Sequence, residues 1–218
     1  MFDVCSDHLY SFVPRRVVSI SSDIILFMIK EQPTREKILD VVFELVYIHG
    51  YNGTSMSMIL KECGIPKGSL YHFFKSKKEM VIAVIRERLA PKMDQFFTFE
   101  PVEGKDGIES IVHAVVHVSQ NKMLVTYGCP LNRLNQEMSP VDETFDKEIT
   151  VLYENLKAKV VSLLQVSDLK EGTDIDSLAD YVIETVWGAL SLSPSQSSRH
   201  RYLHSVKHLN SYLRSLRQ

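Results

Sequence analysis

Helical periodicity runs through this chain from Thr34 to its last residue. Apolar residues recur at three- and four-residue spacing, as Ile38, Val42, Leu45 and Val46 do in the first segment. Signals for strands are nearly absent, because no Asn-Gly turn joins two alternating apolar runs. The pattern predicts an all-α chain of about nine helices.

Start and stop residues divide this pattern into segments. Gly50 ends the first segment, and Thr54 with Ser55 begins the second. Ser76 and Glu79 form a capping box, which predicts a helix from there to Pro91. Further helices are expected over residues 106–123, 123–136, 140–165, 174–192 and 196–217, with start signals at Ser139–Asp142 and Thr173.

Charge is unevenly spread along a chain whose net charge is only −2. Residues 34–92 contain ten Lys or Arg against six Asp or Glu, and residues 93–218 contain twelve against seventeen. A basic block ahead of an acidic remainder is expected where one part of a protein meets a polyanion. The three cysteines are too few and too scattered for a disulfide framework or a zinc site, so we predict neither. The cysteines fit a reducing cytosol, and no apolar run is long enough for a membrane helix, so a cytoplasmic protein is expected.

Residues 1–33 differ from the rest of the chain. They lack a clear helical period, and they lack the basic start and cleavage site of a signal peptide. We interpret them as a disordered extension, or as the result of a wrongly assigned start with translation beginning at Met28. Peptides from residues 1–27 in N-terminal mass spectrometry of the native protein would refute the second interpretation.

The stretch KGSLYHFFKSK, residues 67–77, follows the glycine-containing turn ECGIPK. A turn of this length between two short helices is typical of a helix-turn-helix. On a helical wheel Leu70, Phe73 and Phe74 gather on one side, and the opposite side is small and polar. The pattern predicts a recognition helix held by its apolar side. A plain amphipathic helix on a solvated face is the alternative.

The small and polar side of this stretch has chemistry suited to DNA. Gly68 would let the backbone approach closely, and Lys67 and Ser69 can reach base edges from the helix N-terminus. Tyr71 and His72 can donate hydrogen bonds to phosphate. Thr54 and Lys77, each at the start of a neighbouring helix, are two further predicted phosphate contacts. The predicted DNA-binding residues are thus Thr54, Lys67, Gly68, Ser69, Tyr71, His72 and Lys77.

Thr34–Ile85 resembles the N-terminal DNA-binding domain of the TetR (tetracycline repressor) family. The matching features include HGY at 49–51, CGI at 63–65 and the block KGSLYHFFKSKKE. The resemblance implies a homodimeric transcriptional regulator, most often a repressor that a small molecule releases from a palindromic double-stranded DNA operator. It also implies two domains, a DNA-binding domain over residues 34–80 and a regulatory and dimerisation domain over residues 81–218.

The second distinctive stretch is YGCPLNRLNQEMS, residues 127–139. It resembles a G-C-x-L-x-x-L-x-x-E block of the YxaF/LmrA-like and AcuR-like branches of the family. Effector pockets of the family lie among the central helices and are mostly apolar. We therefore predict that effector-pocket residues lie here, with core packing as the alternative, and Cys129 is also a minor candidate for thiol sensing. The pocket candidates are Met123, Tyr127, Cys129, Asn135 and Trp187.

Two features predict how copies of the chain associate. The last segment carries a heptad seam, and the segment before it is apolar on more than one face. We interpret the two as the dimerisation helices of a four-helix bundle, as the family resemblance also implies. The dimer-interface candidates are Tyr202, Val206, Leu209 and Leu213.

Histidines recur at helical spacing, but their surroundings do not favour a metal. His200, His204 and His208 lie off the heptad seam, and His113 and His117 have no matching carboxylate or cysteine. We therefore expect no metal and no cofactor.

The sequence contains no catalytic constellation or phosphate loop, so an enzyme is not expected. Two functions stay open: a ligand-released repressor, and a DNA-binding protein of the same fold without an effector. The second would be controlled by a protein partner or would act in chromosome organisation.

Overall fold

Every regular element in the computed structural model is a helix within the part of the chain that it describes, residues 34–192 and 198–218. A single isolated bridge joins Leu169 and Arg217. The predicted all-α class is therefore confirmed. Residues 35–218 form one unit, and the predictions about residues 1–33 lie outside the described residues.

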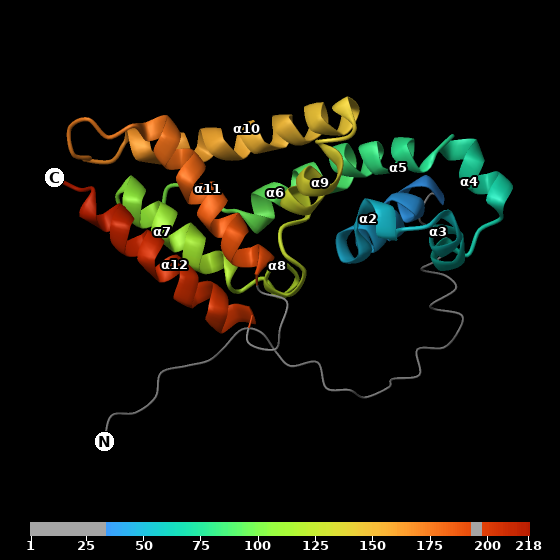
Figure 1. Cartoon of the computed structure of the whole chain (residues 1–218), viewed down its shortest axis with the longest axis horizontal. Coiled ribbons are helices and arrows are strands. Elements are labelled where there is room, and N and C mark those ends of the chain that lie inside the picture. The colour runs from blue at the N-terminus through green and yellow to red at the C-terminus, as the bar shows by residue number, and fades with distance from the viewer. Residues whose placement is uncertain (1–33, 193–197) are drawn as a thin grey trace, which may run out of the picture. The chain divides into compact units, whose positions relative to one another are not determined.

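The first three helices form the predicted helix-turn-helix (Figure 1). They are α2 (Thr34–Gly53), α3 (Met56–Cys63) and α4 (Lys67–Phe73). Gly50 breaks the helical geometry of α2 with φ 78° and ψ 173°, but one more turn follows it. Ser55 caps α3 by accepting from the Met58 N–H, and Gly64 ends α3 in the left-handed conformation.

The next segment is longer than the sequence predicts. It consists of α5 (Lys77–Val84), the π turn η1 (Ile85–Leu89) and α6 (Ala90–Phe96), which follow one another directly. The expected cap by Ser76 is present, since its hydroxyl accepts from the Glu79 N–H, but the Glu79 carboxylate accepts from the N–H of Lys75, one residue before the N-cap, rather than from that of Ser76. The expected end at Pro91 is wrong, because the helix continues past this proline, which comes directly after the π turn, where the regular i→i−4 hydrogen bonding is already interrupted.

Six helices make up the rest of the described chain. Capping residues move two of the predicted starts: α10 begins after Asp142 and α11 after Asp174, because each aspartate accepts from backbone N–H groups of its helix. Gly128, with φ 84°, splits the expected 123–136 segment into two helices. The six are α7 (Gly107–Val118), α8 (Lys122–Tyr127), α9 (Pro130–Met138), α10 (Glu143–Gln165), α11 (Ile175–Ser191) and α12 (Ser198–Ser215).

The heptad seam of α12 is not a free surface. Its apolar residues are at most 1% exposed, because α12 packs on α7, α8 and α11 of the same chain. The Tyr202 hydroxyl also donates to the Val115 carbonyl of α7 at 2.8 Å. The seam residues therefore belong to the core, and their prediction as dimer-interface residues is wrong. They are Tyr202, Val206, Leu209 and Leu213.

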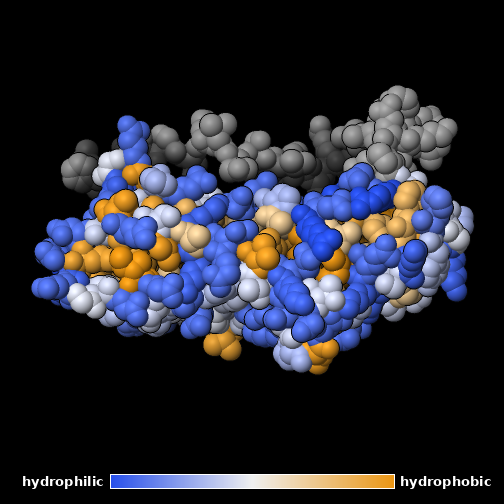
Figure 2. All heavy atoms as spheres, turned by 90° about the horizontal axis from the view of Figure 1, so that it is seen from above, coloured by the Kyte–Doolittle hydropathy of each residue, from blue (hydrophilic) through white to orange (hydrophobic). Residues whose placement is uncertain are grey.

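Apolar side chains also reach the surface of the regulatory helices. Figure 2 shows separate hydrophobic patches on a largely hydrophilic face. Val151 of α10, Tyr181 of α11 and Leu192, directly after α11, are among the exposed large apolar residues. No helix in the described ranges has the length and apolar character needed to cross a lipid bilayer.

Candidate nucleic-acid interface and effector cavity

Helix α4 presents most of its predicted DNA-facing residues to solvent. Lys67, Gly68, Tyr71 and His72 are exposed and Ser69 is half-buried. The Lys67 ammonium lies 5.8 Å from the centre of the Tyr71 ring, so the two side chains cover the same stretch of surface. The helix brings together a cation, a hydroxyl, a phenol and an imidazole with no acidic residue in its first turn. These are side chains that hydrogen-bond to DNA bases and phosphates.

Gly68 meets no other part of the described protein. A side-chain carbon built at this position would have no protein atom within 4 Å. The absence of a side chain is therefore not needed for packing inside the chain. A close approach of the backbone to an external partner accounts for it better.

Two apolar residues hold α4 in place. Leu70 is fully buried and Phe74, directly after the helix, is 3% exposed. Phe73 differs from the prediction, because it is 36% exposed and its ring lies edge-on against His72. The recognition helix is thus anchored by two residues rather than three.

Thr54 does not lie on the predicted DNA-facing surface. It is fully buried, and its hydroxyl donates to the Gly50 carbonyl at 2.7 Å. The prediction of Thr54 as a phosphate contact is therefore wrong. The residue that is exposed at the start of α3 is Ser55, which caps the helix.

Lys77 is largely engaged within the protein. Its ammonium donates to the carbonyls of Tyr51 and Thr54 at 2.8 and 3.0 Å and lies 4.2 Å from the centre of the Tyr51 ring. Burial lowers the pKa of this ammonium. Lys77 thus joins α5 to the end of α2, and its contact with phosphate stays a prediction.

A cavity of about 630 Å³ lies between α9, α10 and α11. Asn135 and Trp187, two of the five predicted pocket residues, line it. Its other polar wall residues were not predicted from the sequence, and they include Asn132, Gln136 and Glu184. The amides at three- and four-residue spacing on α9 are the signal that could have found Asn132 and Gln136.

The other three predicted pocket residues lie elsewhere. Tyr127 and Cys129 line a smaller neighbouring cavity of about 270 Å³, which shares Asn132 and Gln136 with the larger one. Met123 lines neither cavity and packs against the core.

Cys129 does not have the properties of a reactive thiol. Burial raises its pKa to about 12, and the backbone N–H groups at the start of α9 offset this only in part. The hypothesis of a low-pKa sensor thiol at Cys129 is therefore wrong. Cys63 is fully buried in the core.

Two other residues of α9, Arg133 and Glu137, contact the helix-turn-helix. The Glu137 carboxylate accepts from the N–H groups of Tyr51 and Asn52 at 2.7 and 2.6 Å. These N–H groups follow the break at Gly50, where the regular hydrogen bonding of α2 is interrupted. The Arg133 guanidinium donates to the Tyr47 carbonyl at 3.3 Å. Helix α9 therefore lines the larger cavity through its amide residues, and its Glu137 carboxylate binds the backbone at the end of α2.

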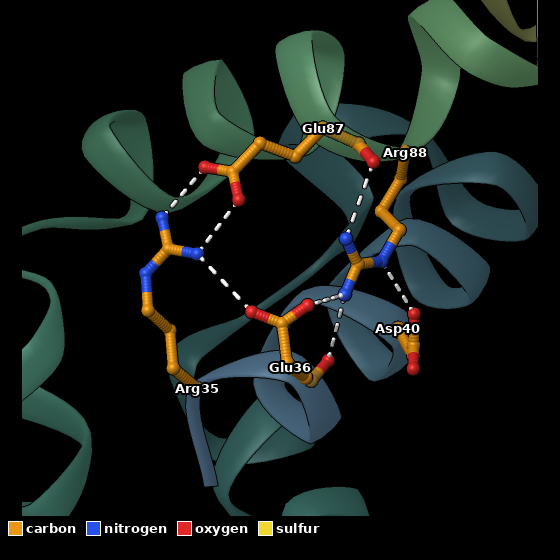
Figure 3. A network of polar contacts seen from close by, with 5 residues as sticks. All are labelled: Arg35, Glu36, Asp40, Glu87 and Arg88. Atoms are coloured by element: carbon orange, nitrogen blue, oxygen red, sulfur yellow. Dashed lines mark hydrogen bonds and ion pairs between the residues drawn. The ribbon is translucent and has the colours of Figure 1, made fainter. Parts of the chain in front are cut away.

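A network of five charged residues joins the start of α2 to η1 (Figure 3). Arg35 forms two hydrogen bonds with Glu87 at 2.7 and 2.6 Å, and Arg88 bonds both Glu36 and Asp40. The hydrogen bond from Arg35 lowers the pKa of the Glu87 carboxyl, and the one from Arg88 lowers that of Glu36. The helix-turn-helix is thus attached to the remaining helices at both ends of α2.

The histidine pairs do not form a metal site. Within the described ranges no group of three or more His, Cys, Asp or Glu side chains is arranged to hold a metal ion. The His113–His117 and His200–His204 ring pairs are stacked at 6.2 and 6.3 Å instead.

Comparison with known proteins agrees with this architecture. Residues 38–84 match the model of the bacterial regulatory proteins of the tetR family. An HTH-type transcriptional regulator in the lacX 3' region of Lactococcus lactis is 33% identical over 136 residues, which are 60% of this chain and 68% of that protein. The chain belongs to the TetR family.

Other TetR-family proteins are similar over more of the chain. The HTH-type transcriptional regulator YxaF of Bacillus subtilis is 26% identical over 168 residues, covering 73% of this chain and 84% of that protein. A crystal structure of a TetR transcriptional regulator from Chloroflexus aurantiacus superposes with a TM-score of 0.73 at 22% identity, covering 86% of this chain and 96% of that one. This last likeness concerns the fold.

The family and the architecture together define what the protein does. It is a TetR-type DNA-binding transcriptional regulator. These relatives are all transcriptional regulators, and the interpretation as an effector-free DNA-binding protein is not favoured.

Proposed function

We propose that this TetR-type regulator is a repressor that binds a palindromic operator as a homodimer and is released by a small molecule. The observation that carries the proposal is the double role of α9, which lines a cavity and holds the end of α2. A cavity occupant that moves α9 would move the helix-turn-helix with it. Because the ligand would favour one of two arrangements, its binding would shift their populations.

On the DNA side, Lys67 and Ser69 read base edges and the Gly68 backbone lies close to the DNA. Tyr71 and His72 bind phosphate, as their exposure at the surface of α4 allows. The DNA-binding domain then comprises residues 34–80 and the regulatory domain residues 81–218. A regulator of this kind works where the chromosome is, and we accordingly expect it in the bacterial cytoplasm.

Dimerisation would use the outer surface of α10 and α11. Val151 and Tyr181 are exposed there and do not line the cavity. The exposed side of α12 carries mainly histidine, lysine, arginine and serine, which suits a solvated surface better. Two recognition helices in such a dimer have to reach successive major grooves, about 34–36 Å apart.

The cavity favours a ligand-released regulator over one controlled by a protein partner. A pocket filled by side chains alone would favour the partner, whereas a cavity of about 630 Å³ has the size of a small-molecule site.

The DNA-reading part of the proposal is tested by selecting bound sites from a pool of random duplexes. We expect Lys67→Ala and Ser69→Ala to change the preferred sequence, and Tyr71→Phe to weaken binding to all sequences alike. Lys122→Ala is the matched control, because it removes an exposed lysine from α8. An unchanged preferred sequence in both the Lys67 and Ser69 variants would overturn the assignment of α4 as the reading helix.

A further inference from the structure

The larger cavity has a wall without a free positive charge. Its polar residues from α9 are the amides Asn132, Asn135 and Gln136, and Glu184 is its only charged residue. The Glu184 carboxylate has no ion pair or hydrogen bond with any described residue, so its charge is not neutralised by a neighbour. An occupant of the cavity therefore meets neutral dipoles and one unpaired negative charge.

Lys157, one turn after Tyr153 on α10, does not change this balance. Lys157 is bound to two carboxylates, those of Asp176 and Asp180, at 2.8 Å each. The Tyr153 hydroxyl, from another residue of the cavity wall, donates to Asp180 as well. The group of Lys157, Asp176 and Asp180 carries a net negative charge, which adds to that of Glu184.

Hydrogen-bonding capacity on the cavity wall is partly unused. Asn132 and Gln136 bond each other, and Asn132 also bonds Ser191, but the Asn135 amide has no partner among the described residues. The Trp187 indole N–H is buried without a partner as well. An unpaired buried donor costs free energy, so an acceptor that reaches the indole N–H from the cavity favours binding, and the half-buried Asn135 amide offers a further donor and acceptor. Ile149 and Leu192 supply an apolar side.

We propose that this cavity takes an uncharged or cationic molecule with an apolar part and hydrogen-bonding groups, and that it discriminates against carboxylates and phosphates through Glu184. The proposal rests on the proposed function in so far as the cavity is the effector site. It names the chemical class of effector that the regulator would sense.

The chain provides its own reporter for the test. Trp187 is the only tryptophan of the protein and lines the cavity, so its fluorescence reports occupancy directly. The probes are 4-phenylbutanamide, 4-phenylbutylamine and 4-phenylbutanoate, which share one apolar part and differ in the charge of their polar group. Excitation is at the red edge of the tryptophan band, where the tyrosines do not absorb, and Trp187→Phe must abolish the signal.

In the wild-type protein the amide and the amine should each bind more tightly than the carboxylate. The difference should be on the order of 5-fold to 10-fold at low ionic strength, because an exposed carboxylate repels a like charge a few ångströms away only modestly. In Glu184→Gln the carboxylate should bind about as well as the amide. Glu154→Gln is the matched control, since it removes an exposed charge from α10 outside the cavity and should leave the wild-type ratio unchanged.

Three outcomes would overturn the inference. The carboxylate could bind at least as tightly as the amide, the ratio could stay the same in Glu184→Gln, or both variants could change the ratio equally. Arg133 lines the smaller neighbouring cavity. Carboxylate binding that Arg133→Met abolishes would therefore place an anion there and contradict the proposal.

Operator release, measured with the same probes, separates this inference from the proposed function. Charge-dependent binding without any change in DNA affinity would contradict the ligand-released repressor and leave the inference standing. Release of the operator by the carboxylate alone would support the ligand-released repressor and contradict the inference about the charge of the ligand.

Discussion

Helices α4 and α9 are both short, but their polar side chains have opposite environments. In α4 the lysine, tyrosine and imidazole groups face solvent, and one fully buried leucine within the helix anchors them. In α9 the arginine, glutamate and Asn132 are bonded to other helices of the same chain. A polar surface without internal partners is available to bind another molecule, whereas polar groups bonded to two neighbouring helices link the positions of those helices, and the amides of α9 that line the cavity are left for a ligand.

The largest expected effect tests the anchoring of α4. Leu70→Ala should lower the free energy of unfolding by about 2–5 kcal/mol, because it leaves a cavity under a helix with little other burial. Thermal or urea unfolding measures this effect. Phe73→Ala is the control and should cost clearly less, since Phe73 is partly exposed. Equal losses in the two variants would contradict the two-residue anchor.

The second prediction concerns the helix break at Gly50 of α2, next to the backbone N–H groups that Glu137 of α9 binds. Gly50 has a backbone conformation that other residues adopt only with strain, and an added side-chain carbon would lie 2.8 Å from a Glu137 oxygen. Gly50→Ala should therefore cost about 1–3 kcal/mol of folding free energy and weaken operator binding.

Gly53→Ala is the control for Gly50→Ala, because an added carbon there makes an ordinary 3.5 Å contact at a position without positive φ. Unfolding curves of the two variants are compared with the wild type. If Gly53→Ala proves as destabilising as Gly50→Ala, the special geometry of the break is not the cause.

The smallest expected effect tests transmission through α9. Glu137→Gln keeps the size of the side chain but replaces one acceptor oxygen by a donor, so one of the N–H groups of Tyr51 and Asn52 loses its partner. We expect a loss of about 1–2 kcal/mol in stability and a smaller change of operator affinity on effector binding. The measurements are unfolding by urea and operator titration with and without effector. An unchanged effector response would show that α9 is not the transmitting element.

Local sequence patterns predicted much of the helix-turn-helix and of the start of α5 correctly. Leu70 as an anchor, the exposed residues of α4 and the cap by Ser76 all depend on residues close in sequence, so helical spacing was sufficient. Thr54 was misjudged because Ser55, the next residue, is the one that caps α3, while the Thr54 hydroxyl donates to the Gly50 carbonyl.

The regulatory region depends on packing between distant segments, which spacing does not reveal. The seam of α12 was predicted to meet a second copy of the chain, whereas helices α7, α8 and α11 of the same chain cover it. A heptad pattern identifies an apolar side without identifying its partner. Glu137 stood in the distinctive YGCPLNRLNQEMS stretch, yet its role depends on Tyr51 and Asn52, more than eighty residues earlier.

The uninterrupted run from α5 through η1 to α6 has a mechanical consequence. Residues 77–96 form a rod about 30 Å long, given a rise of about 1.5 Å per residue. One end is joined to α4 by residues 74–76, and the other packs on α10, which lines the larger cavity. If such a rod tilts by about 5° about its cavity end, its other end moves by about 2.6 Å. This displacement is about half the pitch of an α-helix. A small displacement around a ligand could thus become a shift of the recognition helix large enough to lose its register with a DNA groove.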